Sequence, residues 1–324
     1  MRLSNVALAC VATLALGATG AHAEKWDMPM AYAASNYHSQ NGENFAKCVT
    51  DATGGKLEVV THPGGSLFKG GQIKRAVQTG QAPIGERLLS AHANENPLFG
   101  VDSVPFVATS FDDSEKLWKA AADKLKAALD AQNLVYIYAV PWPPQGLYFK
   151  KPVEKVADMK GIKFRAYNAA TSRIAELAGM VPVQIEAAEL SQALATGVAS
   201  AFISSGSTGY DRKVWEHLTH FYDVQAWLPR NTVFANKSAF NGLDGATKKA
   251  VTDCGAKAAA DGLAKAKELT SFYLDGLRKG GMTVAEPGAG LKKELQGFGE
   301  IMTKEWLKAV GSNGKDIIDA FRGN

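Results

Sequence analysis

An arginine at the end of a strand-like segment has the side chain and the position to bind an anion. Residues 160–165 read Lys-Gly-Ile-Lys-Phe-Arg, and Asn168 then stands where the N-cap of a helix beginning near Ala169 belongs. The planar guanidinium of Arg165 matches a carboxylate, and the free N–H groups of a helix start also attract anions. Arg165 and Asn168 therefore predict a carboxylate-binding site. The alternative is an arginine paired with a nearby acid such as Glu189.

A cluster of hydroxyl groups follows a second strand-like segment, residues 198–203. The chain continues there as Ser-Ser-Gly-Ser-Thr-Gly-Tyr over residues 204–210, which places Ser204 and Ser205 directly after the expected strand. Their donors could complete the carboxylate site or bind a second polar group of a ligand. Hydroxyl groups at this position are equally typical of ordinary helix capping.

Aromatic and charged side chains after other expected strands supply the remaining candidates for a pocket wall: Tyr37, Phe68, Arg87, Trp142, Tyr210 and Trp215. Aromatic rings bury a large area with few rotamers, so they suit a flat or apolar ligand body. The Pro-Trp-Pro-Pro sequence around Trp142 and the serine-rich segment favour a monocarboxylate with an apolar or aromatic body. Arg87 could instead recognise a second carboxylate, which would make the ligand a diacid.

The sequence lacks the familiar motifs of catalytic sites. It contains no Gly-x-Ser-x-Gly, no Gly-x-x-x-x-Gly-Lys-Ser/Thr, no Gly-x-Gly-x-x-Gly and no His-Glu-x-x-His. His217 and His220 could share one face of an expected helix, but they lack a third metal ligand nearby. We therefore expect neither an enzyme nor a bound metal or cofactor.

The first residues indicate export. Arg2 precedes an apolar run over residues 6–16, and Ala-His-Ala over residues 21–23 supplies the small residues of a cleavage site. This order predicts a secretory signal peptide, residues 1–23, that is cleaved after Ala23. In an oxidising compartment Cys48 and Cys254 could form a disulfide, or they could remain two buried thiols.

Charge and length limit the remaining possibilities. The formal net charge is +4 over 324 residues, and Lys and Arg are spread along the chain. This pattern argues against nucleic acid as a partner. No apolar run after residue 23 approaches the length of about 18 residues that a membrane helix requires. A chain of this length usually divides into two domains.

The elements that must position these residues alternate between strand and helix. Expected strands cover 56–61, 134–140, 162–166, 181–185 and 198–203, and expected helices cover 112–129, 169–178 and 189–196. Such alternation predicts parallel sheet with helices on both faces. A strand at 231–235 precedes long helical stretches at 244–278 and 290–322, the second of which is interrupted near Gly311. No low-complexity linker separates two halves, so several chain crossings should join two lobes as a hinge.

Taken together, these segments resemble the TRAP-transporter solute-binding proteins of the DctP type. The resemblance covers nearly the whole chain after residue 23 and is carried by residues 45–56, 62–67, 161–165, 177–183, 188–190, 193–198 and 236–243. It implies an α/β protein with a two-lobed, type II-like periplasmic-binding-protein fold, hinge-crossing strands and long C-terminal helices. We expect lobe I to comprise 24–143 plus 232–278 and lobe II to comprise 144–231 plus 279–324.

The resemblance also implies a function. Such proteins close on a small organic acid in the periplasm and deliver it to the membrane permease subunits of a TRAP transporter. The family's arginine at the end of this strand binds the ligand carboxylate, and here that residue is Arg165. The family usually has an asparagine near the end of the following strand, where this chain has Ser204, which argues against a sugar-acid ligand. The alternatives are a dicarboxylate or sugar-acid binding protein, a binding protein that feeds a sensor, and, less favoured, a periplasmic enzyme.

Overall fold

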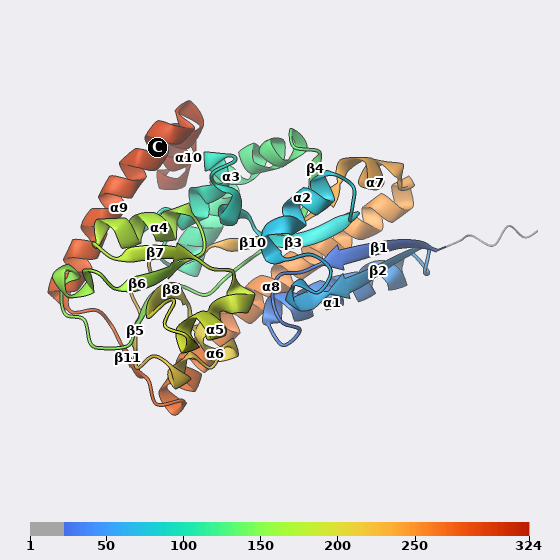
Figure 1. Ribbon diagram of the computed structural model, residues 1–324. Coiled ribbons are helices and arrows are strands. Elements are labelled where there is room, and N and C mark those ends of the chain that lie inside the picture. The colour runs from blue at the N-terminus through green and yellow to red at the C-terminus, as the bar shows by residue number, and fades with distance from the viewer. Residues whose placement is uncertain (1–22, 324) are drawn as a thin grey trace, which may run out of the picture.

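The computed structural model describes residues 23–323, which form two α/β lobes (Figure 1). The predicted signal peptide lies almost entirely outside the described residues. Helices and short 3-10 segments alternate with strands along the chain, as the sequence pattern predicts. Within the described residues, no helix has the length and apolarity needed to cross a membrane.

The first lobe is built around five strands. They are β1 (Glu24–Pro29), β2 (Leu57–His62), β3 (Ile84–Leu88), β4 (Leu134–Pro141) and β10 (Arg230–Asn236). β1 pairs in parallel with β2, and β10 lies between β3 and β4 in antiparallel pairing. A bridge between Met30 and Glu86 joins the two groups. The helices of this lobe are α1 (Tyr37–Ala52), α2 (Ile73–Gln78), α3 (Phe111–Asp130) and α7 (Lys237–Gly242).

The second lobe contains a six-stranded sheet with the order β11-β9-β5-β8-β6-β7. Its strands are β5 (Gln145–Phe149), β6 (Lys163–Ala166), β7 (Val181–Gln184), β8 (Ala201–Ser205), β9 (His220–Tyr222) and β11 (Thr283–Ala285). β6 pairs in parallel with both β7 and β8. The lobe also holds α4 (Ala169–Leu177), α5 (Leu190–Ala195) and α6 (Gly206–Asp211). The carboxyl ends of β6, β7 and β8 therefore meet at one edge, where open α/β sheets bind ligands.

Two extended segments and one long helix are three of the connections between the lobes. The segment after β4 and the segment before β10 run side by side, because the Trp142 N–H donates to the Pro229 carbonyl and the Gln145 N–H donates to the Trp227 carbonyl. Helix α8 (Gly245–Lys279) is 35 residues long and packs on α1 and β4 in the first lobe and on α6 and β11 in the second. These crossings form the expected hinge geometry.

The last two helices both contact the first lobe. Helix α9 (Ala289–Val310) packs against α4 of the second lobe and against the 3-10 segment Pro97–Ser103 of the first, whereas α10 (Ser312–Arg322) packs against α3 of the first lobe (Figure 1). The predicted boundaries placed all of 279–324 in lobe II. The structure instead brings Ile317 of α10 into the apolar cluster that contains Leu117 and Leu125 of α3.

Most of the predicted elements are present, and the differences lie at their ends. The apolar positions of α3, including Leu117 and Leu125, are buried at helical spacing, but the helix begins one residue before the predicted start, at Phe111, and Ser110 caps it. β8 extends through Ser205, two residues beyond the predicted strand. Trp142 follows β4, as predicted.

Two predictions outside the sheets also have clear outcomes. Cys48 and Cys254 form a disulfide that joins α1 to α8, so they are not free thiols. His217 follows a short 3-10 helix (Val214–Glu216) and His220 belongs to β9, so the two do not share a helix face. Among the described residues, no group of three or more potential ligands could hold a metal ion.

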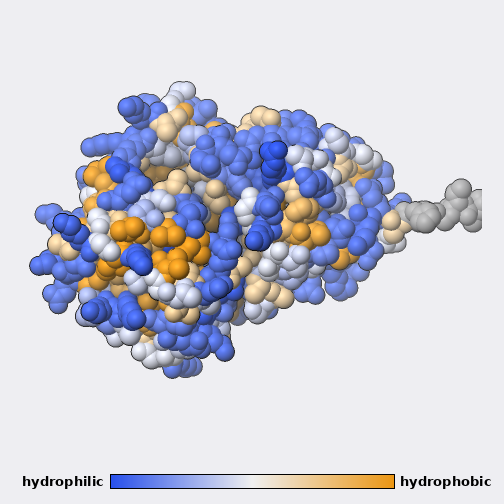
Figure 2. Space-filling view, viewed as in Figure 1, coloured by the Kyte–Doolittle hydropathy of each residue, from blue (hydrophilic) through white to orange (hydrophobic). Residues whose placement is uncertain are grey.

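The face shown in Figure 2 is largely hydrophilic, with its larger apolar area over the second lobe and a smaller one over the first. Val181 on the edge strand β7 is 51% exposed, and Val198 before β8 is also exposed. The edge strand contains Pro182, which lacks a backbone N–H and so limits pairing with another chain.

Candidate functional site

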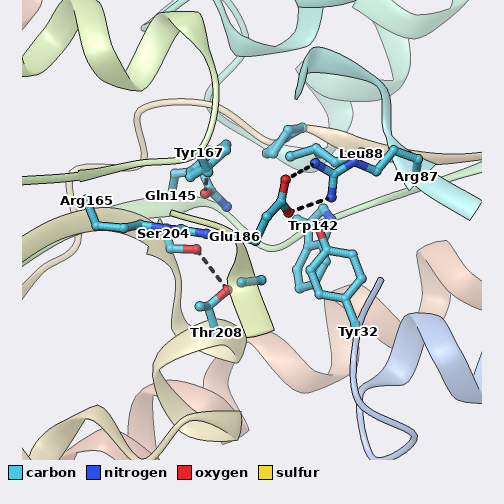
Figure 3. A pocket seen from close by; sticks show the side chains of 12 residues that line it. Tyr32, Arg87, Leu88, Trp142, Gln145, Arg165, Tyr167, Glu186, Ser204 and Thr208 are labelled. Atoms are coloured by element: carbon cyan, nitrogen blue, oxygen red, sulfur yellow. Dashed lines mark hydrogen bonds and ion pairs between the residues drawn. The ribbon is translucent and has the colours of Figure 1, made fainter. Parts of the chain in front are cut away.

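A cavity lies where the two lobes and the hinge segments meet (Figure 3). The first lobe contributes Tyr32, Arg87 and Leu88, and the hinge segments contribute Trp142, Gln145 and Pro229. The second lobe contributes the rest of the lining: Arg165, Tyr167, Glu186, Ala187, Ser204 and Thr208. All of these second-lobe residues lie at or just after the carboxyl ends of β6, β7 and β8.

Arg165 is held rigidly at the cavity wall. It lies on the inner strand β6 between two fully buried neighbours, and its Nε donates to the Ile185 carbonyl over 2.9 Å. Its guanidinium carbon lies 5.1 Å from the centre of the Tyr167 ring, within the range of a cation–π contact. Burial lowers the pKa of Arg165 to about 10, so the guanidinium remains charged near pH 7.

The charge of Arg165 has no acidic partner among the described residues. The only hydrogen bond of the Arg165 side chain within residues 23–323 is made by Nε, which leaves the two terminal nitrogens for a ligand. The alternative pairing with Glu189 does not occur, because Glu189 is exposed at the end of a short 3-10 helix. A planar, buried, unpaired guanidinium that lines a cavity is suited to bind a carboxylate.

Arg87 has a different environment. Its Nη1 donates to Glu186 Oε2 over 3.0 Å and its Nη2 donates to Glu186 Oε1 over 2.8 Å. The two side chains come from opposite lobes, since Arg87 lies on β3 and Glu186 follows β7. Figure 3 shows this two-pronged ion pair at one side of the cavity. The charge of Arg87 is therefore already compensated.

Aromatic and polar groups complete the lining. The Trp142 ring packs edge-on against Tyr32 at 4.7 Å between centres, and its Nε1 donates to Asn231 Oδ1 over 2.8 Å. On the second lobe, the Tyr167 hydroxyl donates to Gln145 Oε1 and the Ser204 hydroxyl donates to Thr208 Oγ1. The cavity therefore combines apolar walls with a few fixed polar groups, as small-molecule sites do.

Four of the predicted site residues line this cavity: Arg87, Trp142, Arg165 and Ser204. Asn168 does not, because its side chain caps α4: Oδ1 accepts from the Thr171 N–H, while Nδ2 donates to Ser90 Oγ across the lobes. Ser205 caps α6 and is fully buried. The cap at Asn168 was predicted, and capping was the stated alternative for the hydroxyl cluster that contains Ser205.

The remaining predicted residues lie elsewhere. Tyr37 packs behind Trp142 and donates its hydroxyl to the Pro141 carbonyl, while Phe68 packs against the apolar cluster of the first lobe that includes α3. Tyr210 and Trp215 line a separate outer groove with Phe272 of α8. They face outward because α6 packs on α8, where their rings lie against Gly276 and Gly280.

Sequence reasoning missed several lining residues: Tyr32, Gln145, Tyr167, Glu186 and Thr208. Two of them had a usable signal. Tyr167 comes directly after β6, and Glu186 follows β7, the neighbouring parallel strand, so both satisfy the strand-end rule that selected Arg165. Gln145 lies where the hinge segments pair, and this position depends on contacts between distant parts of the chain.

The model of bacterial extracellular solute-binding proteins, family 7 (DctP), matches residues 30–312. A TRAP solute-binding protein from a marine metagenome, specific for pyroglutamate and crystallised with co-purified pyroglutamate, is 58% identical with a TM-score of 0.92. That match covers 93% of this chain and 99% of the other. DctP6 of Bordetella pertussis, an extracytoplasmic solute receptor binding pyroglutamic acid, is 46% identical with a TM-score of 0.91, over 93% and 100% of the two chains.

A more distant relative is the monocarboxylate 2-oxoacid-binding periplasmic protein of Nostoc sp. (strain PCC 7120). It is 25% identical over 227 residues, which are 68% of this chain. The match spans 62% of the length of that protein.

Proposed function

Because the chain belongs to the bacterial extracellular solute-binding proteins of family 7, we propose that it binds a compact monocarboxylate such as pyroglutamate and delivers it to the membrane subunits of a TRAP transporter. Family membership and the solved relatives confirm the predicted class of function, the capture of a small organic acid. The two relatives with the highest identities cited above both bind pyroglutamate, which is a monocarboxylate.

The observation that carries this proposal is the distribution of charge in the cavity. Its lining contains two arginines and one glutamate, and Glu186 forms its ion pair with Arg87. One positive charge, that of Arg165, is left for a ligand. A single carboxylate balances this charge, whereas a diacid would bring a second negative charge towards Glu186.

The rest of the lining supports a small ring-shaped acid. Tyr32, Trp142 and Tyr167 offer flat apolar surfaces for a ring. The Gln145 amide and the hydroxyl groups of Ser204 and Thr208 offer donors and acceptors for an amide group within that ring. A sugar acid would need partners for several more hydroxyl groups than these side chains provide.

The compartment and the absence of catalysis are further parts of the proposal. A signal peptide cleaved after Ala23 would place the mature protein in the periplasm, where the disulfide between Cys48 and Cys254 can form. The twelve residues drawn around the cavity include no histidine, cysteine or lysine. The Ser204 hydroxyl contacts another hydroxyl rather than a base, which argues for binding without chemistry.

Calorimetric titration of refolded protein with L-pyroglutamate tests this function. Wild-type protein should bind, and Arg165→Ala should weaken binding at least about a hundredfold, or about 2.8 kcal/mol, because a two-pronged charged contact is lost. Arg165→Lys should recover only part of this affinity, since lysine cannot bond the Ile185 carbonyl and the carboxylate as a planar fork.

Arg173→Ala is the matched control. Arg173 lies on the surface of α4 and pairs with Glu305, so its loss should leave binding unchanged. An Arg165→Ala variant that binds as tightly as wild type would remove Arg165 from the site. A folded wild-type protein that binds no monocarboxylate would refute the proposed ligand class.

A further inference from the structure

We propose that Glu186 determines the specificity of the cavity: by pairing with Arg87, it restricts the site to acids with one carboxylate. The inference rests on the proposed function, because it concerns which organic acids the same site accepts. Three observations support the inference: the geometry of the Arg87–Glu186 pair, the backbone that packs on it, and the charge of Arg165, which the pair leaves without a partner.

Arg87 is positioned by the sheet of the first lobe. It lies on β3 opposite Thr232 of the central strand β10, and its side chain is only 5% exposed. Glu186 reaches it from the second lobe and accepts one hydrogen bond on each carboxylate oxygen, over 2.8 and 3.0 Å. The pair is thus a direct contact between the lobes at the cavity wall (Figure 3).

The backbone at Gly70 and Gly71 packs closely on one side of the pair. A Cβ at Gly70 would lie 2.7 Å from Arg87 Nη1 and 2.8 Å from Glu186 Oε2, and a Cβ at Gly71 would lie 3.3 Å from Glu186 Oε1. The two glycines therefore allow the backbone to pack directly on the ion pair. The Arg87 side chain is 5% exposed and that of Glu186 is 36% exposed, so the pair is shielded from water on the side where the glycines pack and open on the other.

The consequence for ligands follows from charge. Without the carboxylate of Glu186, Arg87 would present a second guanidinium to the cavity that Arg165 lines, and two guanidinium groups suit a diacid. With Glu186 present, the second carboxylate of a diacid meets a negative charge that already occupies Arg87. Specificity of this kind arises from repulsion of the wrong ligand as much as from attraction of the right one.

Glu186→Gln tests the inference, because glutamine has nearly the same size and can still accept one hydrogen bond from Arg87. Dissociation constants for L-pyroglutamate, glutarate and succinate should be measured by calorimetry on refolded protein at pH 7. We expect the preference for pyroglutamate over the better-bound diacid to fall about tenfold or more, the effect of one charge-assisted contact.

Three further variants make the result specific. The double variant Arg87→Gln/Glu186→Gln should lose the gain in diacid binding, because Arg87 is the group that Glu186→Gln exposes. Arg87→Gln alone leaves Glu186 unpaired and should weaken the binding of both kinds of acid. Glu189→Gln, at an exposed position three residues further on, should change no affinity.

The outcomes separate this inference from the proposed function. If wild-type protein and Glu186→Gln bind pyroglutamate and equally exclude both diacids, the inference is wrong and the proposed function stands. If the double variant also gains diacid affinity, Arg87 is not the group responsible, and the inference is again wrong. If wild-type protein binds no monocarboxylate, the proposed function itself fails. Should Glu186→Gln not fold, Arg87→Gln with unchanged affinities would also overturn the inference.

Discussion

Glu86 precedes Arg87 on β3 and points to the opposite face of the strand, into the interior of the first lobe. Its Oε1 accepts a hydrogen bond from Asn231 Nδ2 over 2.6 Å, while its Oε2 has no partner among the described residues. His38 Nδ1 lies 3.6 Å from Glu86 Oε1. Burial lowers the pKa of His38 well below its ordinary value, so this imidazole is neutral. Burial raises the pKa of Glu86 to about 7.

This buried carboxyl group should make the stability of the protein depend on pH. The pKa of Glu86 is higher in the folded state than the ordinary 4.5 of the unfolded chain, so its contribution to stability is fully present below about pH 4.5 and is lost as the pH rises towards 7. The loss should be on the order of 2–3 kcal/mol. Glu86→Gln should remove this slope, as measured by urea unfolding at pH 5, 6 and 7.5.

Glu58→Gln, an exposed position on β2, is the control and should keep the slope. A Glu86→Gln variant with the same pH dependence as wild type would show that another group causes it. Other buried groups also contribute to the pH dependence: burial raises the pKa of Asp102 to about 6 and lowers that of His92 to about 4. Their effects persist in Glu86→Gln, so the difference between the two proteins isolates Glu86.

At the scale of the elements, local patterns predicted the strands and helices but not the contacts that their terminal residues make. The N-cap at Asn168 was predicted correctly, yet capping and a bond to Ser90 use this side chain, so it does not line the cavity. Ser204 and Ser205 belong to β8 because they pair with Gly146 and Gln145 of β5, a strand some sixty residues earlier. No local pattern contains that pairing.

The same limit explains the errors in the candidate site. Arg165 was found because a strand end next to a helix cap is a local feature. The partner of Arg87 was not found, because Glu186 lies 99 residues later on the opposite lobe. Tyr210 and Trp215 follow a strand as predicted, but their outward direction depends on the packing of α6 against the glycines of α8.

The disulfide between two helices should stabilise the folded protein. It joins α1 to α8 between residues that are 206 positions apart. A cross-link over such a distance restricts the unfolded chain, so Cys48→Ala/Cys254→Ala should lose about 2–5 kcal/mol of unfolding free energy. Ligand affinity should change little, because neither cysteine lines the cavity. Thermal and urea unfolding of the variant, and of wild type with dithiothreitol, provide the measurement.

Wild-type protein under reducing conditions should match the double variant without reductant. Equal midpoints for oxidised wild type and the double variant would mean that the bridge adds nothing to stability. A large loss of pyroglutamate affinity in the double variant would mean that the α1–α8 contact also positions the cavity.

At the scale of the whole molecule, several polar side chains form hydrogen bonds between the two lobes. Arg87 pairs with Glu186, Asn168 Nδ2 donates to Ser90 Oγ, and Asn36 Nδ2 donates to Asp211 Oδ2 over 2.7 Å. The largest apolar cluster also continues through the hinge from one lobe into the other. A ligand bound between the lobes favours closure in proportion to its extra affinity for the closed state, and contacts that already favour closure raise its apparent affinity.

The contact between Asn36 and Asp211 allows this coupling to be tested at two residues that lie beside the cavity but are not part of its lining. Asn36 caps α1 through Oδ1 and reaches Asp211 through Nδ2. Aspartate caps helices as well as asparagine does, so Asn36→Asp should keep the stability of α1 but place two carboxylates face to face. Burial already raises the pKa of Asp211, which indicates that this position tolerates added negative charge poorly. We expect pyroglutamate affinity to fall about 10- to 150-fold, the effect of losing one hydrogen bond to a charged group. Small-angle scattering without ligand should show a larger radius of gyration.

In Asn36→Asp/Asp211→Asn the donor and acceptor exchange places, so affinity and compactness should return. If Asn36→Asp binds like wild type, or if the exchange does not restore binding, this contact does not contribute to closure.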